Sequence, residues 1–274
     1  MMTGTDASLN PEWQLPGFQT TLLGDKTSKY AIIIPVINEG GRIQSQLRKM
    51  KQQGICDAID TVIVDGGSTD GSLALDFLEQ EGVRALLVKT GPGKLSAQLR
   101  CGYAWALSEG YEGIITIDGN DKDGVDAIPK FMDALDKGYA YAQASRFING
   151  GRSKNIPWLR YCAIRFVHAP LQSLAARHWF TDTTQGFRAY SREFLLDQKT
   201  QPFRDIFKKY ELLAYLTVRA SQLGYAVTEI PTSRVYPAQE PVPTKIRGLA
   251  PLFDLLLVLF KALLGSYNPK SRSS

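Results

Sequence analysis

The sequence has few cysteines and no long, uninterrupted apolar segment. Among its 274 residues, the three cysteines are Cys56, Cys101 and Cys162. Their odd number and wide spacing fit neither a disulfide framework nor a metal-binding cluster, so we expect reduced thiols in an intracellular protein. The N-terminus also lacks the apolar core of a signal peptide, and we therefore expect no export.

The longest apolar stretch, residues 249–265, is interrupted by Asp254 and Lys261. It is shorter than the roughly 20 residues needed to span a bilayer. Two interpretations remain open for this stretch. It is either a helix that lies on a membrane surface or an ordinary helix packed on the domain.

The composition fits one globular domain with an anionic partner. The chain is 44% hydrophobic and 22% charged, and its formal net charge is +5. A sugar nucleotide, a lipid phosphate, a membrane surface or a nucleic acid would each match that charge. We expect a loosely ordered N-terminal segment over residues 1–28, one domain over 29–235, and a C-terminal segment over 236–274.

Strand-like and helix-like segments alternate along the first half of the chain. Such alternation predicts an α/β fold with a mixed, mostly parallel sheet flanked by helices. The predicted strands cover residues 30–36, 61–65, 85–89, 113–118 and 226–230, and the predicted helices cover 42–53, 73–81, 96–109 and a segment closing at 217–224.

Polar residues follow several of these predicted strands. Asn38 and Glu39 follow the first strand, Asp65 follows the second, and Asp118-Gly119-Asn120 follow the fourth. Ligands of such sheets bind at the carboxyl ends of the strands. The oxygens of Asp118 and Asn120 suit a divalent cation that would neutralise a diphosphate, although the same tripeptide could merely end a strand.

Two nucleotide-binding signatures are absent. The Gly-Pro-Gly-Lys turn at residues 91–94 offers Lys94 to a phosphate, but it lacks the upstream glycine and the Ser or Thr of a P-loop. No predicted strand is followed by Gly-x-Gly-x-x-Gly. Asp70 is expected to cap the helix that follows it.

Several of these motifs resemble those of glycosyltransferase family 2. Residues 35–39 (PVINE) are similar to its Pro-x-x-Asn-Glu motif, residues 64–71 (VDGGSTDG) to Val-Asp-Asp-Gly-Ser-x-Asp-Gly, and 118–120 (DGN) to its metal-binding Asp-x-Asp. The resemblance implies a GT-A, Rossmann-like fold with C-terminal amphipathic helices. It also implies Mg²⁺ or Mn²⁺ at Asp118 and Asn120, held less firmly because Asn120 is neutral and Lys122 replaces a glutamine. The implied nucleotide-sugar site comprises Pro35, Val36, Asn38, Glu39, Asp65, Gly67, Lys94, Asp118, Gly119 and Asn120.

The segment 181–192 (TDTTQGFRAYSR) resembles the signature of polyprenyl-phosphate sugar transferases, the dolichyl-phosphate mannose synthase-like branch. The resemblance implies that Asp182, Gln185, Arg188 and Glu211 are catalytic. It places Arg188, Arg234 and Lys245 on an acceptor phosphate and makes 236–274 an acceptor loop followed by the apolar helix. A buried arginine tied to carboxylates is the alternative for Arg188.

These features predict an inverting hexosyltransferase that uses GDP-mannose or a UDP-hexose and a polyprenyl phosphate. The alternatives are a family 2 transferase with a sugar-hydroxyl acceptor in polysaccharide or glycolipid assembly, and a catalytically weak nucleotide-sugar-binding protein. Basic and aromatic residues alternate between positions 146 and 179, which favours an anionic lipid surface over RNA. We expect a cytoplasmic protein, peripheral on the inner face of the plasma membrane, in which His168 and His178 are structural.

Overall fold

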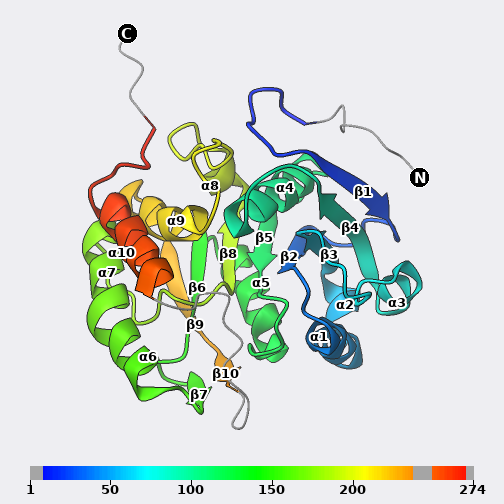
Figure 1. Cartoon of the computed structure of the whole chain (residues 1–274), viewed down its shortest axis with the longest axis horizontal. Helices are drawn as coiled ribbons and strands as arrows, with labels where there is room; N and C mark the ends of the chain where they lie inside the picture. The colour runs from blue at the N-terminus through cyan, green and yellow to red at the C-terminus, as the bar shows by residue number, and fades with distance from the viewer. Residues whose placement is uncertain (1–8, 237–248, 270–274) are drawn as a thin grey trace.

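A computed structural model describes residues 9–236 and 249–269, and its centre is one eight-stranded sheet (Figure 1). All neighbouring strands are parallel except at β1 and β8, which run antiparallel to the strands beside them. The mixed, mostly parallel sheet predicted from the sequence is confirmed. In spatial order the strands are β1 (Phe18–Leu22), β4 (Val83–Lys89), β3 (Asp60–Asp65), β2 (Tyr30–Val36), β5 (Gly113–Thr116), β8 (Arg188–Ser191), β6 (Tyr141–Ser145) and β9 (Val227–Pro231).

Helices cover both faces of this sheet, because successive side chains of a strand point to opposite sides. Ile33 packs into the core on one face, whereas Ile32 and Ile34 pack into the core on the other. The first face is covered by α4 (Leu95–Ser108), α7 (Ala169–Ala176), α8 (Arg192–Leu196), α9 (Glu211–Gln222) and α10 (Leu249–Leu263), and the second by α1 (Gly41–Gln52), α2 (Ile55–Ala58), α3 (Leu75–Gln80) and α5 (Ile128–Asp136).

A smaller sheet and an irregular helical run complete the fold. The small sheet pairs β7 (Arg152–Lys154) with β10 (Ser233–Val235) in parallel. The helical run consists of α6 (Trp158–Ala163), a π-helix named η2 (Ile164–His168), and α7; a short 3₁₀ helix, η1 (Val125–Ala127), precedes α5. In the described part of the chain, no helix has both the length and the apolar character needed to cross a membrane.

The N-terminal segment differs from the loosely ordered stretch predicted over residues 1–28. Residues 18–22 form β1, which pairs along its whole length with β4. Trp13 also packs its ring against Phe203, with ring centroids 4.2 Å apart. The physical reason is that β4 would otherwise be an open sheet edge, and an added strand satisfies its backbone groups.

Helix α4 approaches the sheet closely at Gly102. A Cβ atom at this position would lie 2.7 Å from Ile33 Cγ2 and 2.8 Å from Val64 Cγ2. One turn earlier, Gln98 Nε2 donates to the carbonyl oxygens of Val36 and Val64, at 2.9 and 3.0 Å. The glycine and the glutamine together fix the start of α4 beside the carboxyl ends of β2 and β3.

We predict that Gly102→Ala destabilises the protein by about 1–2 kcal/mol, because overpacking a filled core costs more than a helical alanine gains. Urea denaturation measures the difference. Gly41→Ala in α1 is the matched control, since a Cβ there meets nothing within 4 Å. Equal stabilities of the two variants would contradict the close approach of α4.

Candidate active site

The predicted polar motifs meet at the crevice between β2 and β5. From β2 the chain adds β3 and β4 on one side and later adds β5 on the other, which makes this edge the switch point of the sheet. Gly119 follows β5 and lies against the end of β2, where an added Cβ would be 2.9 Å from Val36 Cγ2. Pro35 and Val36 are themselves buried in β2, so they shape the crevice through their backbone and apolar surface.

Two loops at this edge are cross-linked by hydrogen bonds. Asn38 N–H donates to Ser68 Oγ at 3.0 Å, and Thr69 N–H donates to Asn38 Oδ1 at 2.8 Å. Gly40 N–H donates to Asp70 Oδ2 at 2.8 Å. The prediction that Asp70 caps the following helix is therefore wrong, because α3 begins after Ala74 and Asp70 joins the two loops instead.

The acidic residues of these loops hold the loops in shape. Asp65 accepts hydrogen bonds from the N–H and hydroxyl of Ser68, at 2.9 and 2.6 Å. Glu39 forms an ion pair with Arg42 at 2.8 Å. Gly67, with φ of 99°, has open space around its Cα. The predicted nucleotide-site residues after β2 and β3 thus lie in two loops that hydrogen bonds hold together.

Asp118 lies at the centre of the site with its side chain 27% exposed. The signature segment passes directly against it, since a Cβ on Gly186 would be 2.3 Å from Asp118 Oδ1. The side-chain oxygen of Asn120 accepts a hydrogen bond from the N–H of Lys122 at 3.3 Å. A carboxylate and an amide oxygen fit a hard divalent cation.

The described residues, 9–236 and 249–269, contain no group of three or more His, Cys, Asp and Glu side chains that could hold a metal ion. Phosphate oxygens of a nucleotide are of the type that a hard cation at Asp118 would also accept.

The positively charged side chain of Arg234 lies next to Asp118. Arg234 Nη1 donates to both carboxylate oxygens of buried Asp123, at 2.7 and 2.6 Å, and Arg234 Nη2 lies 3.6 Å from Asp118 Oδ2. Burial alone would lower the pKa of Arg234, but the charges of the two aspartates raise it, so this arginine stays cationic. Burial and the neighbouring Arg234 lower the pKa of Lys122 to about 8.

The predicted catalytic residue Asp182 is fully buried in an ion pair with Arg146. Arg146 Nε lies 2.6 Å from Asp182 Oδ2, and Arg146 Nη2 lies 3.0 Å from Oδ1. Gln185 Nε2 also donates to Asp182, at 2.9 Å. Burial alone would raise the pKa of Asp182, but the hydrogen bonds and charge of Arg146 hold it below its ordinary value. Asp182 and Gln185 thus position Arg146 rather than contact a reacting atom.

Arg188 differs from its predicted role on the acceptor phosphate. Its side chain is buried, and its N–H groups donate to backbone oxygens of Thr183, Gln185 and Leu213 and to the Thr217 hydroxyl. The physical reason is that β8 lies in the middle of the sheet, where Arg188 ties the signature segment to α9. The alternative of a buried arginine is correct as to burial, but the expected carboxylate partners are replaced by backbone oxygens and a hydroxyl.

Glu211 and Lys94 meet through the backbone at another edge of the site. Glu211 Oε2 accepts hydrogen bonds from the N–H groups of Lys208 and Lys209, at 3.0 and 2.7 Å. The carbonyl of Lys208 in turn accepts a bond from Lys94 N–H at 2.7 Å. Glu211 therefore shapes the loop that supports the start of α4. Lys245 lies outside the described residues.

Three arginines converge on one phenol, a feature that our sequence analysis missed. Arg146 Nη1 lies 2.5 Å from the hydroxyl of Tyr236. The guanidinium carbons of Arg160 and Arg234 lie 5.5 and 5.8 Å from the centre of its ring. The signal in the sequence is that no aspartate or glutamate occurs between Asp136 and Asp182.

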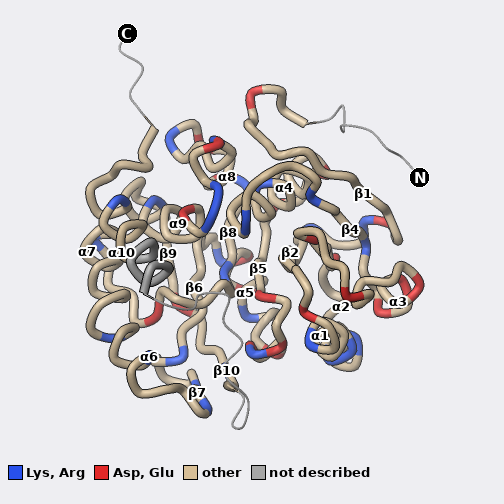
Figure 2. Tube along the Cα trace, viewed as in Figure 1, with Lys and Arg blue, Asp and Glu red and all other residues tan. Residues whose placement is uncertain are grey.

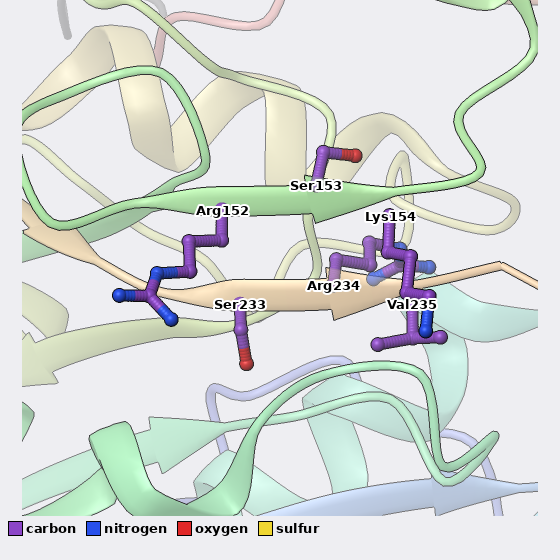
Figure 3. A pocket seen from close by; sticks show the side chains of 6 residues that line it. All are labelled: Arg152, Ser153, Lys154, Ser233, Arg234 and Val235. Carbon is purple, nitrogen blue, oxygen red and sulfur yellow. The ribbon is translucent and has the colours of Figure 1, made fainter.

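A cavity of about 450 Å³ adjoins this arginine cluster. Figure 3 shows its walls on neighbouring strands, with Arg152 and Lys154 on β7 and Arg234 on β10. Arg234 belongs to both the cavity and the cluster, whereas Arg152 and Lys154 lie opposite Ser233 and Val235, on the other face of the small sheet. The positive charge on this small sheet suits an anionic group.

The fold is that of a GT-A glycosyltransferase. The structure is similar to crystal structures of glucosyl-3-phosphoglycerate synthase from Mycobacterium tuberculosis. For the complex with Mn²⁺, UDP and glucosyl-3-phosphoglycerate, the TM-score is 0.57 at 17% identity, covering 88% of this chain and 81% of that one. For the complex with Mg²⁺ and UDP, the TM-score is 0.60 at 19% identity, with 88% and 80% covered.

The sequence model described as glycosyl transferase family 2 matches residues 31–197. The chain belongs to this family, as its motifs predicted. It is 28% identical over 209 residues to polyprenol monophosphomannose synthase of Mycolicibacterium smegmatis, covering 75% of this chain and 77% of that protein. It is 25% identical over 209 residues to undecaprenyl-phosphate mannosyltransferase of Micrococcus luteus, covering 74% and 82%.

His168 is packed beneath the site, with Nδ1 2.7 Å from the Thr183 hydroxyl. Burial and the nearby charge of Arg188 lower its pKa to about 4. An unfolded chain would bind a proton at this residue below about pH 6.5. The folded protein binds it only near pH 4, so folding stability falls as the pH falls through that window.

The wild type loses folding stability between neutral pH and pH 4. We predict that this loss is smaller in His168→Asn, by up to about 3 kcal/mol. Urea denaturation at a series of pH values measures this slope. The exposed His178 provides the control, since His178→Asn should keep the wild-type pH dependence. An unchanged slope in His168→Asn would show that other groups cause the acid sensitivity.

Proposed function

We propose that this protein transfers a hexose from GDP-mannose or a UDP-hexose to a polyprenyl phosphate, with inversion and with metal assistance. The main observation in support of this proposal is the cluster of Arg146, Arg160 and Arg234 around Tyr236, next to Asp118. It supplies a place for a second anion beside the donor diphosphate. The relatives from Mycolicibacterium smegmatis and Micrococcus luteus, named for polyprenol and undecaprenyl phosphates, support this acceptor class.

On the donor side, the cross-linked loops after β2 and β3 would hold the nucleoside. Asp118 and Asn120 would hold Mg²⁺ or Mn²⁺, which would neutralise the charge of the diphosphate. The solved neighbours that contain UDP with Mn²⁺ or Mg²⁺ support this choice of cation. Lys122 and Arg234 add positive charge at the same place, and this charge would act on the diphosphate directly, beside a cation that neutral Asn120 holds less firmly.

On the acceptor side, a phosphate oxygen would attack the anomeric carbon of the sugar. The bond from this carbon to the diphosphate breaks, and the leaving nucleoside diphosphate keeps the electron pair. Such an acceptor is already anionic at neutral pH, so positioning replaces a general base. A sugar hydroxyl would have to lose its proton to a base. Because both oxygens of Asp182 are engaged by Arg146, this carboxylate is poorly placed to act as that base, which favours a phosphate acceptor.

This proposal places the protein on the cytoplasmic side of a membrane, in peripheral contact with it. The donor is water-soluble, whereas the polyprenyl chain of the acceptor is held in the bilayer. An enzyme that joins the two must work at the surface between them.

We predict metal-dependent binding of GDP or UDP, measured by calorimetric titration with and without Mn²⁺. Asp118→Asn should abolish the effect of Mn²⁺. Gly186→Ala should weaken metal-dependent binding by about 10- to 100-fold, because its Cβ displaces the Asp118 carboxylate. Asp133→Asn on the exposed side of α5 is the control. If neither nucleotide binds, the donor assignment is wrong. Binding that is equally strong with and without Mn²⁺ would contradict the proposed role of the metal.

We predict that Arg160→Gln raises the KM for a polyprenyl phosphate by about tenfold or more, through the loss of charge-assisted hydrogen bonds. The KM for the nucleotide sugar should stay unchanged. Arg48→Gln is a matched control, since Arg48 also lies over an aromatic ring, that of Phe77 at 5.2 Å, but on α1. Turnover with sugar hydroxyls and none with lipid phosphates would instead support the family 2 alternative.

A further inference from the structure

The helical run formed by α6, η2 and α7 exposes apolar side chains on its outer face. Leu159, Phe166 and Leu174 are 82%, 71% and 67% exposed. Their spacing of seven and eight residues places them on one side of a helix. Trp158 and Trp179, 71% and 64% exposed, stand at the two ends of the run. We call these five residues the apolar ridge.

Helix α10 extends this apolar surface. It packs against α7 and α9, and the three helices lie along one edge of the molecule (Figure 1). Leu257 and Phe260 on its outer side and Leu264 directly after its last residue are 42%, 49% and 78% exposed. Their spacing of three and four residues again marks one helical face. Two neighbouring helical elements therefore leave apolar side chains in water, a cost that a partner would remove.

The same region holds an excess of positive charge. Between Asp136 and Asp182 the chain has seven lysines and arginines and no acidic residue. The whole chain has a formal charge of +5, so all remaining residues together are net negative by two. Figure 2 shows basic positions along β7 and α6. Exposed Arg152, Lys154 and Arg177 are among them.

The inner face of the helical run contacts the arginine cluster. Tyr161 packs edge-on against Phe147, with ring centroids 5.7 Å apart, and Phe147 directly follows Arg146. Arg165 donates to the carbonyl of Thr181 at 3.2 Å. These contacts place the helical run beside the ion pair of Arg146 and Asp182.

We propose that the apolar ridge and the outer face of α10 dock onto a phospholipid bilayer that contains anionic lipids. Exposed tryptophans, phenylalanines and leucines with arginines beside them match the headgroup boundary of such a membrane. A second copy of this chain is a poorer occupant, because two identical ridges would bring like charges together. The proposal rests on the proposed function, since it makes this bilayer the one that carries the acceptor.

The test is co-sedimentation of the full chain with phosphatidylcholine vesicles, with and without phosphatidylglycerol. The wild type should bind the anionic vesicles, and added salt should weaken the binding. The double variant Phe166→Ser with Leu174→Ser should lower the partition coefficient by about tenfold or more. The double variant Leu22→Ser with Leu75→Ser, which changes two leucines that are 60% and 41% exposed on β1 and α3, should bind as the wild type does.

A second assay separates the failure of this proposal from the failure of the proposed function. Transfer to a short, water-soluble isoprenoid phosphate should be the same in the wild type and in both double variants, because the ridge does not contact the reacting groups. Two outcomes would overturn the docking surface alone. In the first, transfer is normal but the wild type does not bind vesicles; in the second, transfer is normal and the ridge variant binds vesicles as well as the wild type does. Ridge-dependent vesicle binding without any transfer supports the surface and overturns the acceptor. A dimer that the ridge variant breaks, without vesicle binding, assigns the ridge to a second copy.

Discussion

The buried ion pair of Arg146 and Asp182 is the interaction on which the arginine cluster depends. It joins the end of β6 to the segment before β8, and both oxygen atoms of the Asp182 carboxylate accept hydrogen bonds from Arg146. Through its remaining N–H groups, Arg146 also holds Thr184 and Tyr236. Removing one member would leave the other charged and buried, which costs about 3–5 kcal/mol. The pair therefore fixes where the arginine cluster forms.

The strands β2, β3, β4 and β5 could be predicted because each is a β-branched or apolar run that is buried on both sides. The strands β1 and β8 could not. Residues 18–22 contain two threonines and form a strand only because β4 offers them an edge. The strand β8 begins at Arg188, whose charge is accepted in the core because backbone oxygens surround it. Pairing and burial decide these two cases, and neither is visible in a local pattern.

The two halves of the site differ in the same way. The half that contains Asn38, Asp65 and Asp118 is made of short loops directly after β2, β3 and β5, so its residues are close in space wherever the sheet forms. The arginine cluster joins positions 146, 160 and 236, which only the tertiary fold brings together. Arg188 has the residue type that suits a phosphate, but its place in a central strand gives it a structural role. A motif thus predicts a segment's location better than the task of each residue in it.

One helical run connects the arginine cluster to the apolar ridge, and its geometry constrains how a lipid phosphate could reach the site. A π-helical turn at residues 164–168 interrupts the run. Such turns are rare in proteins, and where they occur they are often found at functional sites. Within this turn His168 contacts Thr183 beneath the site, while Phe166 faces solvent. If the bilayer meets Phe166, the acceptor's polyprenyl chain stays on the outer side of the run. Its phosphate then has to pass an edge of the run to meet Arg160 and Arg234, and β7 and β10 line the basic cavity at that edge.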